Sequence, residues 1–438
     1  MLSGRLPDPP TAVRRGPLRA GAFPSTLHDQ RVASLLGIAL GITFGTCFLT
    51  GLVSHFMQHP PTWLSWPSRP VWLYRVTQGL HVTTGLASVP LLLVKLWTVY
   101  PRLWEWPPVR SVAHALERLT IVPLIAGSIF QLATGIANIA QWYRFHFFFT
   151  VTHYWVAWIT IGALVVHIAA KLTTVRANVG RKRHERIPGT AVSAAPERTA
   201  GGREGDSRRE GAGGGGQVLE DLEDQGNLGN GRDGAPPAGG LTRRGLAVAT
   251  GTAAAVIVVT TAGQAVPALA PLDLLAPRRP DLGPQGLPVN RTARTARAAR
   301  VAVAARDPGY RLEAVGTRRV GYDLAQLHAL PSHTVRLPIT CVEGWSADAT
   351  WHGPRLRDLL DAALIPVDAT VRVESLEAHG GYRASEVRPA HARDPLTLLA
   401  TGLNDADLEL YHGYPARLIA PDRPGVLQTK WVHRVVLL

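Results

Sequence analysis

Cysteine is scarce in this 438-residue chain, which contains only Cys47 and Cys341. Cys47 lies inside a long apolar run and Cys341 in the polar C-terminal part, so no structural disulfide is expected between them. Cys341 is then either a small buried hydrophobic residue or a cysteine with another role.

Acidic residues are also few, because 32 Asp and Glu stand against 46 Lys and Arg, a formal net charge of +14. The basic residues flank apolar runs and form no single stripe beside stacking aromatic residues. Nucleic acid is therefore not expected as a partner. A chain of this length should contain at least two folding units.

Long apolar runs, by contrast, are abundant. Four of them reach the roughly 20 residues that a membrane helix requires, at 32–56, 73–97, 115–140 and 149–172. A fifth, weaker run covers 246–270. We therefore expect an N-terminal tail (1–30), an all-α four-helix membrane bundle (31–175) and a fifth transmembrane helix (244–270), all in contact with lipid where they cross the membrane.

Lys and Arg are unevenly distributed around the first four runs. If the N-terminus is cytoplasmic, the outer loops hold only Arg69, Arg75 and Arg144, whereas the inner flanks are rich in basic residues. The positive-inside rule then predicts that both ends of the bundle are cytoplasmic and that the fifth span carries residues 281–438 outward. The predicted location is a bacterial cell membrane, crossed several times, with an extracytoplasmic C-terminal domain.

The segment 176–243 is rich in Gly, Arg, Glu and Asp and poor in large apolar residues. This composition cannot offset the entropy of folding, so it predicts a disordered cytoplasmic linker. Its last residues and the start of the next run, Thr242-Arg243-Arg244-Gly245-Leu246, resemble a twin-arginine export signal. An ordinary basic flank of a membrane helix explains the same residues.

Two histidines share one predicted helix. His153 and His167 are 14 residues apart, which separates them by about 21 Å along the axis and leaves them within about 40° of one face. An ionisable side chain in a span usually faces a partner or cofactor, and haem iron binds imidazole. One helix can then hold a ligand for each of two haems. Bonding to polar groups of neighbouring helices is the plain alternative.

Depth in the membrane suggests partners for these two histidines. His81, near the outer end of the second run, should meet the outer one across a haem, and His55 is a substitute or a residue that lines the site. For the inner one, His28 and His114 both lie at the cytoplasmic edge, and His28 is preferred.

The topology and the histidine placement resemble the four-helix di-haem cytochrome b subunits of membrane dehydrogenases and reductases, over about residues 25–175. The resemblance implies b-type haem, with two copies expected, and electron exchange with quinone or quinol.

Residues 281–438 have a different pattern. Short alternating runs such as 371–376 and 432–437 predict strands, and 354–364 predicts a short helix with leucines on one face. We expect a β-rich α+β domain.

An ordered series of motifs runs through this region. They are Thr340-Cys341-Val342-Glu343-Gly344-Trp345-Ser346, Asp394-Pro395-Leu396-Thr397-Leu398-Leu399-Ala400, His412-Gly413-Tyr414-Pro415-Ala416-Arg417-Leu418-Ile419-Ala420-Pro421 and Lys430-Trp431-Val432. Together they resemble the molybdopterin-binding domain shared by sulfite oxidases and the catalytic subunit of the periplasmic methionine-sulfoxide reductase, over about residues 285–438. The resemblance implies a fold of sulfite-oxidase type and a molybdenum–molybdopterin cofactor.

Carried over by position, the resemblance makes Cys341 the catalytic residue and the protein ligand of molybdenum, a role that suits a soft thiolate. The cationic donors in the later motifs suit the cofactor phosphate. The residues that the resemblance assigns to cofactor binding, besides Cys341, are Asn290, His412, Arg417, Lys430 and Trp431.

Joined, the two halves predict a membrane-bound, molybdopterin-dependent oxidoreductase that exchanges electrons between the quinone pool, b-type haems and an extracytoplasmic molybdenum site. The expected reaction is reduction of an S-oxide or N-oxide, carried by a small molecule or a protein. Two alternatives stay open: a sulfite-oxidase-like dehydrogenase that passes electrons to quinone, and a non-enzymatic haem sensor or binding protein.

Overall fold

The computed structural model covers the whole chain and describes residues 22–104, 109, 112–144, 146–147, 149–179, 241–276, 282–290 and 296–438. Most of the N-terminal tail and nearly all of the predicted linker 176–243 lie outside the described residues. Met1–Val179 and Thr242–Leu438 belong to one compact unit.

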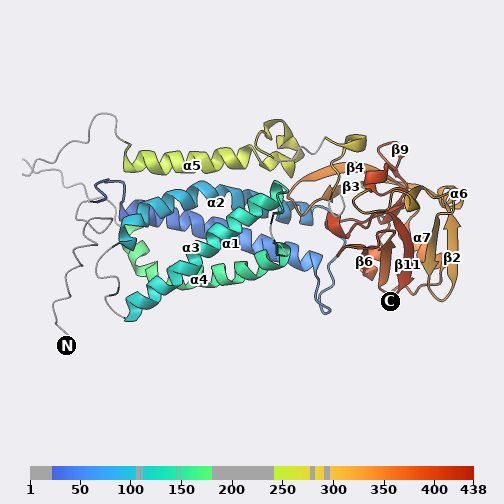
Figure 1. Cartoon of the computed structure of the whole chain (residues 1–438), viewed down its shortest axis with the longest axis horizontal. Helices are drawn as coiled ribbons and strands as arrows, with labels where there is room; N and C mark the ends of the chain where they lie inside the picture. Colours follow the sequence, from blue (N-terminus) through green and yellow to red (C-terminus); the bar gives the residue numbers. More distant parts are fainter. Residues whose placement is uncertain are drawn as a thin grey trace, which may run out of the picture. The chain divides into compact units, whose positions relative to one another are not determined.

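Five helices are long and apolar enough to cross a membrane (Figure 1). They are α1 (Gln30–Gln58), α2 (Leu73–Leu103), α3 (Val112–Ile139), α4 (Phe149–Val179) and α5 (Arg243–Val259). The first four begin within a few residues of the predicted runs, so the positions of these helices were predicted correctly. The fifth is shorter than its run.

α5 ends at Val259, and a 3-10 turn, η2 (Ala262–Gln264), follows. Pro267 opposes any return to α-helix, because proline has no N–H to donate and pushes the residue before it out of the helical conformation. Val266 is accordingly extended. The prediction of continuous helix to residue 270 was therefore wrong at its C-terminal end.

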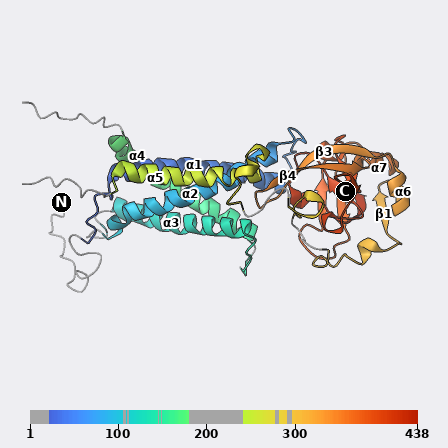
Figure 2. The same ribbon diagram turned by 90° about the horizontal axis from the view of Figure 1, so that it is seen from above.

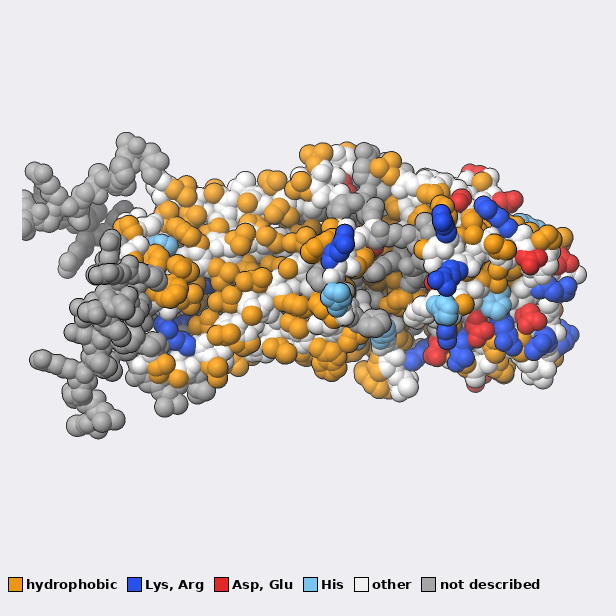
Figure 3. Space-filling view, in the orientation of Figure 1, with side chains coloured by type: hydrophobic (Ala, Val, Ile, Leu, Met, Phe, Trp, Pro, Cys, Tyr) orange, Lys and Arg blue, Asp and Glu red, His pale blue; other side chains and the backbone are white. Residues whose placement is uncertain are grey.

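The apolar helices pack both against their neighbours in the sequence and against helices further away in it. α1 contacts α2 and α4, α3 contacts α2 and α4, and α5 lies mainly against α2 (Figures 1 and 2). A Cβ added to Gly79 of α2 would come within 2.8 Å of the Cβ of Ala265, so glycine permits this close approach. Hydrophobic side chains cover the outside of these helices (Figure 3). A surface of this kind suits a lipid environment.

The C-terminal part is rich in sheet. A five-stranded sheet has the order β2-β1-β11-β5-β6, a four-stranded sheet has the order β3-β4-β8-β9, and β10 pairs with β7. The strands are β1 (Arg311–Val315), β2 (Arg319–Asp323), β3 (His333–Thr340), β4 (Ser346–Gly353), β5 (Val371–Ser375), β6 (Ala384–Val387), β7 (Leu398–Ala400), β8 (Gly402–Leu403), β9 (Ala406–Asp407), β10 (Arg417–Ile419) and β11 (Val432–Leu437). β1 and β11 pair in parallel.

Two hydrophobic clusters organise this domain. One joins the five-stranded sheet to α7 (Leu356–Ala362). The other lies around β3 and β4, and Cys341, Trp345 and Trp351 are members of it. The strands predicted at 371–376 and 432–437 and the helix predicted within 354–364 are confirmed as β5, β11 and α7.

Candidate functional site

Cys341 lies directly after β3, in a tight turn that leads into β4. Its N–H donates to the carbonyl oxygen of Trp345 at 2.9 Å, and the N–H of Gly344 donates to the carbonyl oxygen of Cys341 at 3.0 Å. Gly344 has φ +99°, a conformation that side-chain-bearing residues rarely adopt. Cys341 is fully buried. The turn therefore holds its thiol in a defined direction, as a ligand for a bulky group requires.

Four of the predicted cofactor residues meet in one network. Arg417 donates through Nη2 to Asn290 Oδ1 at 2.8 Å and through Nη1 to the carbonyl oxygen of His412 at 3.0 Å. Lys430 Nζ donates to the carbonyl oxygen of Asn290 at 2.9 Å. All four residues are 5% exposed or less. The folded chain thus gathers segments around residues 290, 412, 417 and 430 that the sequence separates.

The network contains two buried cations and no carboxylate of its own, although Glu377 and Glu409 act on Lys430 from outside it. Burial lowers the pKa of Arg417 to about 9, an effect that the nearby Cys341 opposes. Burial also lowers the pKa of Lys430, and Arg417 adds to that shift. Two buried cations are costly unless an anion lies near them. An anionic cofactor that carries a phosphate would reduce this cost.

Two buried nitrogens in the network point to the same requirement. Arg417 Nε and His412 Nδ1 have no hydrogen-bond partner among the described residues. His412 Nε2 lies 2.8 Å from the carbonyl oxygen of Pro284. Burial, aided by Arg417, lowers the pKa of His412 to about 4, so its ring is neutral at pH 7. Because the carbonyl oxygen of Pro284 can only accept, Nε2 carries the ring proton and Nδ1 is an acceptor. A buried, unused donor at Arg417 and a buried, unused acceptor at His412 fit a polar cofactor at this position.

Trp431 occupies a supporting position. Its ring is fully buried in a cluster with Ala296, Val301 and Leu410. Its Nε1 donates to the carbonyl oxygen of Leu410 at 2.8 Å, and Lys430 Nζ lies 5.0 Å from its ring centroid. These contacts place Trp431 where it holds the segment that carries Lys430. Direct contact with the cofactor stays a prediction.

The Cys341 turn also contacts the apolar helices. Gln78 of α2 and Asn138 of α3 both donate through their side-chain amides to the carbonyl oxygen of Val342, at 3.0 and 3.3 Å. Gln141, just beyond α3, donates to Glu343 Oε2 at 2.6 Å. Sequence reasoning missed these amides. The available signal was the position of three amide side chains at the same predicted end of two apolar runs.

An ion pair strengthens this contact. Arg75 Nη2 lies 2.7 Å from Asp348 Oδ1, and Arg75 Nε donates to Ser346 Oγ at 2.7 Å. Farther along the domain, Arg388 Nη2 donates to the carbonyl oxygen of Pro61, in the loop between α1 and α2, at 3.1 Å. Basic residues of both parts thus take part in joining them.

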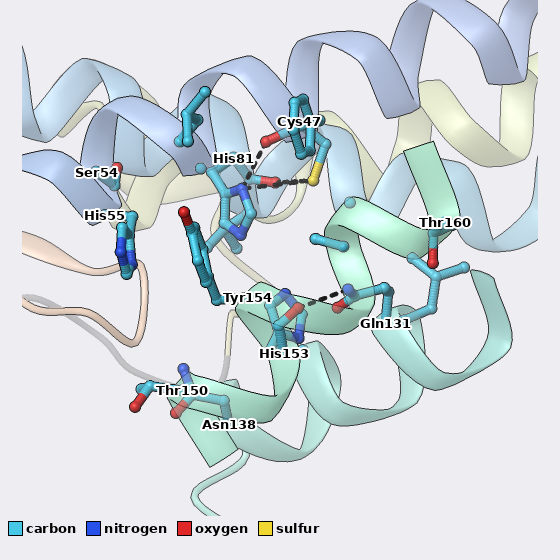
Figure 4. A pocket seen from close by; sticks show the side chains of 18 of the residues that line it. Cys47, Ser54, His55, His81, Gln131, Asn138, Thr150, His153, Tyr154 and Thr160 are labelled. Atoms are coloured by element: carbon cyan, nitrogen blue, oxygen red, sulfur yellow. Dashed lines mark hydrogen bonds between the residues drawn. The ribbon is translucent and has the colours of Figure 1, made fainter. Parts of the chain in front are cut away.

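A cavity of about 240 Å³ lies among α1, α2, α3 and α4 (Figure 4). His81 and His153 both line it, with ring centroids 6.3 Å apart and planes at 76°. The structure therefore brings together the two residues predicted as the outer pair. Gln78 and Val342 line the same cavity. The cavity therefore reaches the residue that follows Cys341 in the sequence.

Hydrogen bonds determine which nitrogen of each ring faces the cavity. His81 Nδ1 lies 2.8 Å from the carbonyl oxygen of Cys47, which can only accept, so Nδ1 carries the proton. His153 Nδ1 lies 3.0 Å from Thr134 Oγ1, whose own proton goes to the carbonyl oxygen of Phe130. Both rings are thus left with a lone pair on Nε2. Cys47 had no role in the sequence analysis.

Two further predicted histidines, His55 and His28, also have contacts in the structure. His55 lines the same cavity and stacks on Tyr154 with centroids 3.8 Å apart, and its role toward haem stays a prediction. His28 lies against Trp97, and its Nδ1 is 3.3 Å from the carbonyl oxygen of Thr98. These contacts hold His28 against α2. The inner pair of His28 with His167 stays a prediction.

Comparison with known proteins concerns mainly the C-terminal part. Residues 300–438 match the family model "Oxidoreductase molybdopterin binding domain". Rat mitochondrial sulfite oxidase (Rattus norvegicus) is 30% identical over 155 residues, 29% of this chain and 28% of that protein. The protein-methionine-sulfoxide reductase catalytic subunit MsrP of Gluconobacter oxydans is 34% identical over 144 residues, 29% of this chain and 46% of that protein.

A third relative is the putative protein-methionine-sulfoxide reductase subunit YedZ1 of Azospira oryzae, 29% identical over 126 residues, 28% of this chain and 47% of that protein. The chain spans between about a quarter and half the length of these curated relatives. The family match covers the β3–β4 turn, β10 and β11. The C-terminal part of this chain is therefore similar to the molybdopterin-binding domain of oxidoreductases.

Proposed function

We propose that this chain is a membrane-bound, molybdopterin-dependent oxidoreductase in which electrons from quinol pass through b-type haem to a molybdenum site that reduces an S-oxide or N-oxide. The observation that carries the proposal is the position of Gln78. Its side chain lines the histidine cavity and donates to the carbonyl oxygen of Val342, next to Cys341. One residue thus connects the two predicted redox sites.

The molybdenum site would be held by residues already gathered in the fold. Cys341 would provide the thiolate, Arg417 and Lys430 would bind the anionic parts of the cofactor, and His412 Nδ1 would accept a hydrogen bond from one of its N–H groups. When bound, the molybdenum cofactor supplies two-electron oxygen-atom transfer. The role of the chain is to hold the thiol rigid, to balance the charge and to exclude water from a buried site.

The geometry of the histidine cavity fits one b-type haem. His81 and His153, whose rings line the cavity with centroids 6.3 Å apart, would hold the haem iron through their Nε2 atoms. The bonds at their Nδ1 atoms would orient both rings, as outer hydrogen bonds do for metal-bound histidines. This fit supports an outer haem within a four-helix bundle of α1–α4.

The proposed direction follows the names of two relatives, both methionine-sulfoxide reductase subunits. The match to sulfite oxidases favours a second candidate, a dehydrogenase that oxidises sulfite and passes electrons to quinone. Both share the same sites and differ only in the direction of electron flow. Reduction of the haem by sulfite in anaerobic membranes would select the second.

The proposed topology places the molybdenum domain outside the cytoplasm of a bacterial cell. At the start of α5, Arg243 Nη1 lies 3.3 Å from Asp29 Oδ2, and Arg243 Nε donates to the carbonyl oxygen of Thr26. These contacts assign a structural role to one arginine of the twin-arginine-like motif. Export of a domain already loaded with cofactor would use the same residues before the helix docks.

Metal analysis of the purified protein tests the proposal. We expect molybdenum and haem in the wild type, loss of molybdenum-dependent turnover with haem retained in Cys341→Ser, and loss of haem with molybdenum retained in His81→Ala and His153→Ala. His328→Ala, an exposed histidine of α6 (Leu324–Ala329), is the matched control. Molybdenum absent from the matured wild type, or full turnover of Cys341→Ser, would contradict the proposal.

A further inference from the structure

Tyr74 lies in the first turn of α2, and its side chain is only 1% exposed. Its hydroxyl oxygen is buried and has no hydrogen-bond partner among the described residues. Buried hydroxyls in folded proteins are nearly always bonded, because an unmade bond loses the hydration that water would have provided. This hydroxyl is therefore available to donate to a group bound beside it.

The surroundings of this hydroxyl identify the site that it faces. Tyr74 N–H donates to Asp422 Oδ1 at 2.7 Å. Asp422 belongs to the loop in which Pro424 forms a bridge with Thr340, the residue before Cys341. Gln78, one turn further along α2, donates to the carbonyl oxygen of Val342, the residue after Cys341, at 3.0 Å. The first turn of α2 therefore reaches the metal side of the molybdopterin site.

A second unused polar atom lies in the same place. Asp422 Oδ2 is buried without a partner among the described residues, although Oδ1 is engaged by Tyr74. A phenol O–H is a good donor to a polarised oxygen. The group that it would receive is thus an oxygen acceptor next to the metal thiolate.

We propose that Tyr74 is a substrate-pocket residue, whose hydroxyl donates a hydrogen bond to the oxide oxygen of an S-oxide or N-oxide bound at the Cys341 site. This proposal rests on the proposed function. It adds that the molybdopterin-binding domain does not form its substrate pocket alone. The apolar helix α2 supplies one of the groups that recognise the substrate.

The alternative is that Tyr74 only fills space between α2 and the domain. The two roles differ in what Tyr74→Phe does. If the hydroxyl serves only packing, its removal changes neither substrate binding nor turnover. If it donates to substrate, the variant keeps its fold and its cofactors but binds substrate less tightly. Because the hydroxyl has no partner within the described protein, its removal should not lower the melting temperature.

The experiment compares full-length wild type, Tyr74→Phe and the control Tyr322→Phe, a partly exposed tyrosine of β2. Molybdenum and haem contents are measured first. Dimethyl sulfoxide is then titrated into the oxidised protein without reductant, and the absorption of the cofactor reports binding without turnover. We expect an at least tenfold higher Kd and a similar loss of kcat/KM in Tyr74→Phe, with molybdenum content and melting temperature retained.

The control should match the wild type in all of these measurements. If Tyr74→Phe carries full molybdenum and its Kd and kcat/KM stay within twofold of wild type, the substrate-pocket role is refuted while the proposed function stands. If the wild type itself carries molybdenum but reduces no S-oxide or N-oxide, the proposed function fails. The wild-type arm therefore separates the two failures.

Discussion

The ion pair of Arg75 with Asp348 provides the sharpest test of how α2 and the Cys341 turn are joined. The two side chains are 15% and 29% exposed, and a second contact of Arg75 Nη1 with Asp348 Oδ2 measures 3.4 Å. Charge-assisted bonds contribute roughly 1.5–3 kcal/mol each, and partial exposure reduces the loss because water can solvate the remaining carboxylate. For Arg75→Met we expect a loss of about 2 kcal/mol in the local stability of the turn.

Hydrogen exchange of the amides of the Cys341–Ser346 turn measures this loss. At about 1.4 kcal/mol for each factor of ten, exchange should accelerate by up to about 30-fold in Arg75→Met. Arg75→Met combined with Asp348→Asn should lose less than the sum of the two single variants. Arg319→Met, whose partner Glu313 lies at 4.0 Å in an exposed pair, is the control. Unchanged protection in Arg75→Met, or an additive double variant, would refute the reasoning.

Three further predictions follow from close contacts and burial. Gly51→Ala should lower the haem content, because the added Cβ would come within 2.7 Å of the His81 ring. Gly45→Ala, where the added Cβ meets open space, should leave the haem content unchanged. Equal haem contents in the two variants would contradict the assignment of the cavity to haem. Gly344→Ala should lower the free energy of unfolding by about 1–3 kcal/mol, and with it the melting temperature, since a Cβ there meets an α2 side chain at 2.6 Å and φ is positive. An unchanged melting curve would contradict this prediction. Burial lowers the pKa of His391 to about 3, from the ordinary histidine value of 6.5. The contribution of the neutral ring to stability is therefore complete above pH 6.5 and is lost progressively as pH falls toward 3. Melting temperatures at pH 7.5 and pH 5 should therefore differ less in His391→Gln than in wild type. The same difference in both proteins would contradict this prediction.

Much of the architecture could be predicted from local pattern. Apolar runs of sufficient length predicted all five apolar helices, because the cost of burying backbone polar groups in lipid leaves few alternatives to a helix. The motif around Cys341 predicted the molybdopterin-binding domain, which the family match bears out. The end of α5 was missed because the apolar run continues past Val259, whereas the α-helix gives way there to a 3-10 turn ahead of Pro267.

The candidate sites were predictable to different degrees. Pairing His81 with His153 needed only depth along two helices, and the structure brings their rings to one cavity. The bond from His81 to Cys47 could not be predicted, because it depends on how two helices are rotated about their axes.

The sequence by itself determined which segments are apolar, which cysteine lies in a family motif and which histidines share a depth. Each of these properties depends on residue type and on spacing along one element. Tertiary structure alone decided that Gln78 and Tyr74 of α2 reach the turn and the loop beside Cys341. The residues involved are more than 260 positions apart, and their proximity depends on how a helix end and a sheet edge pack, which no local pattern encodes.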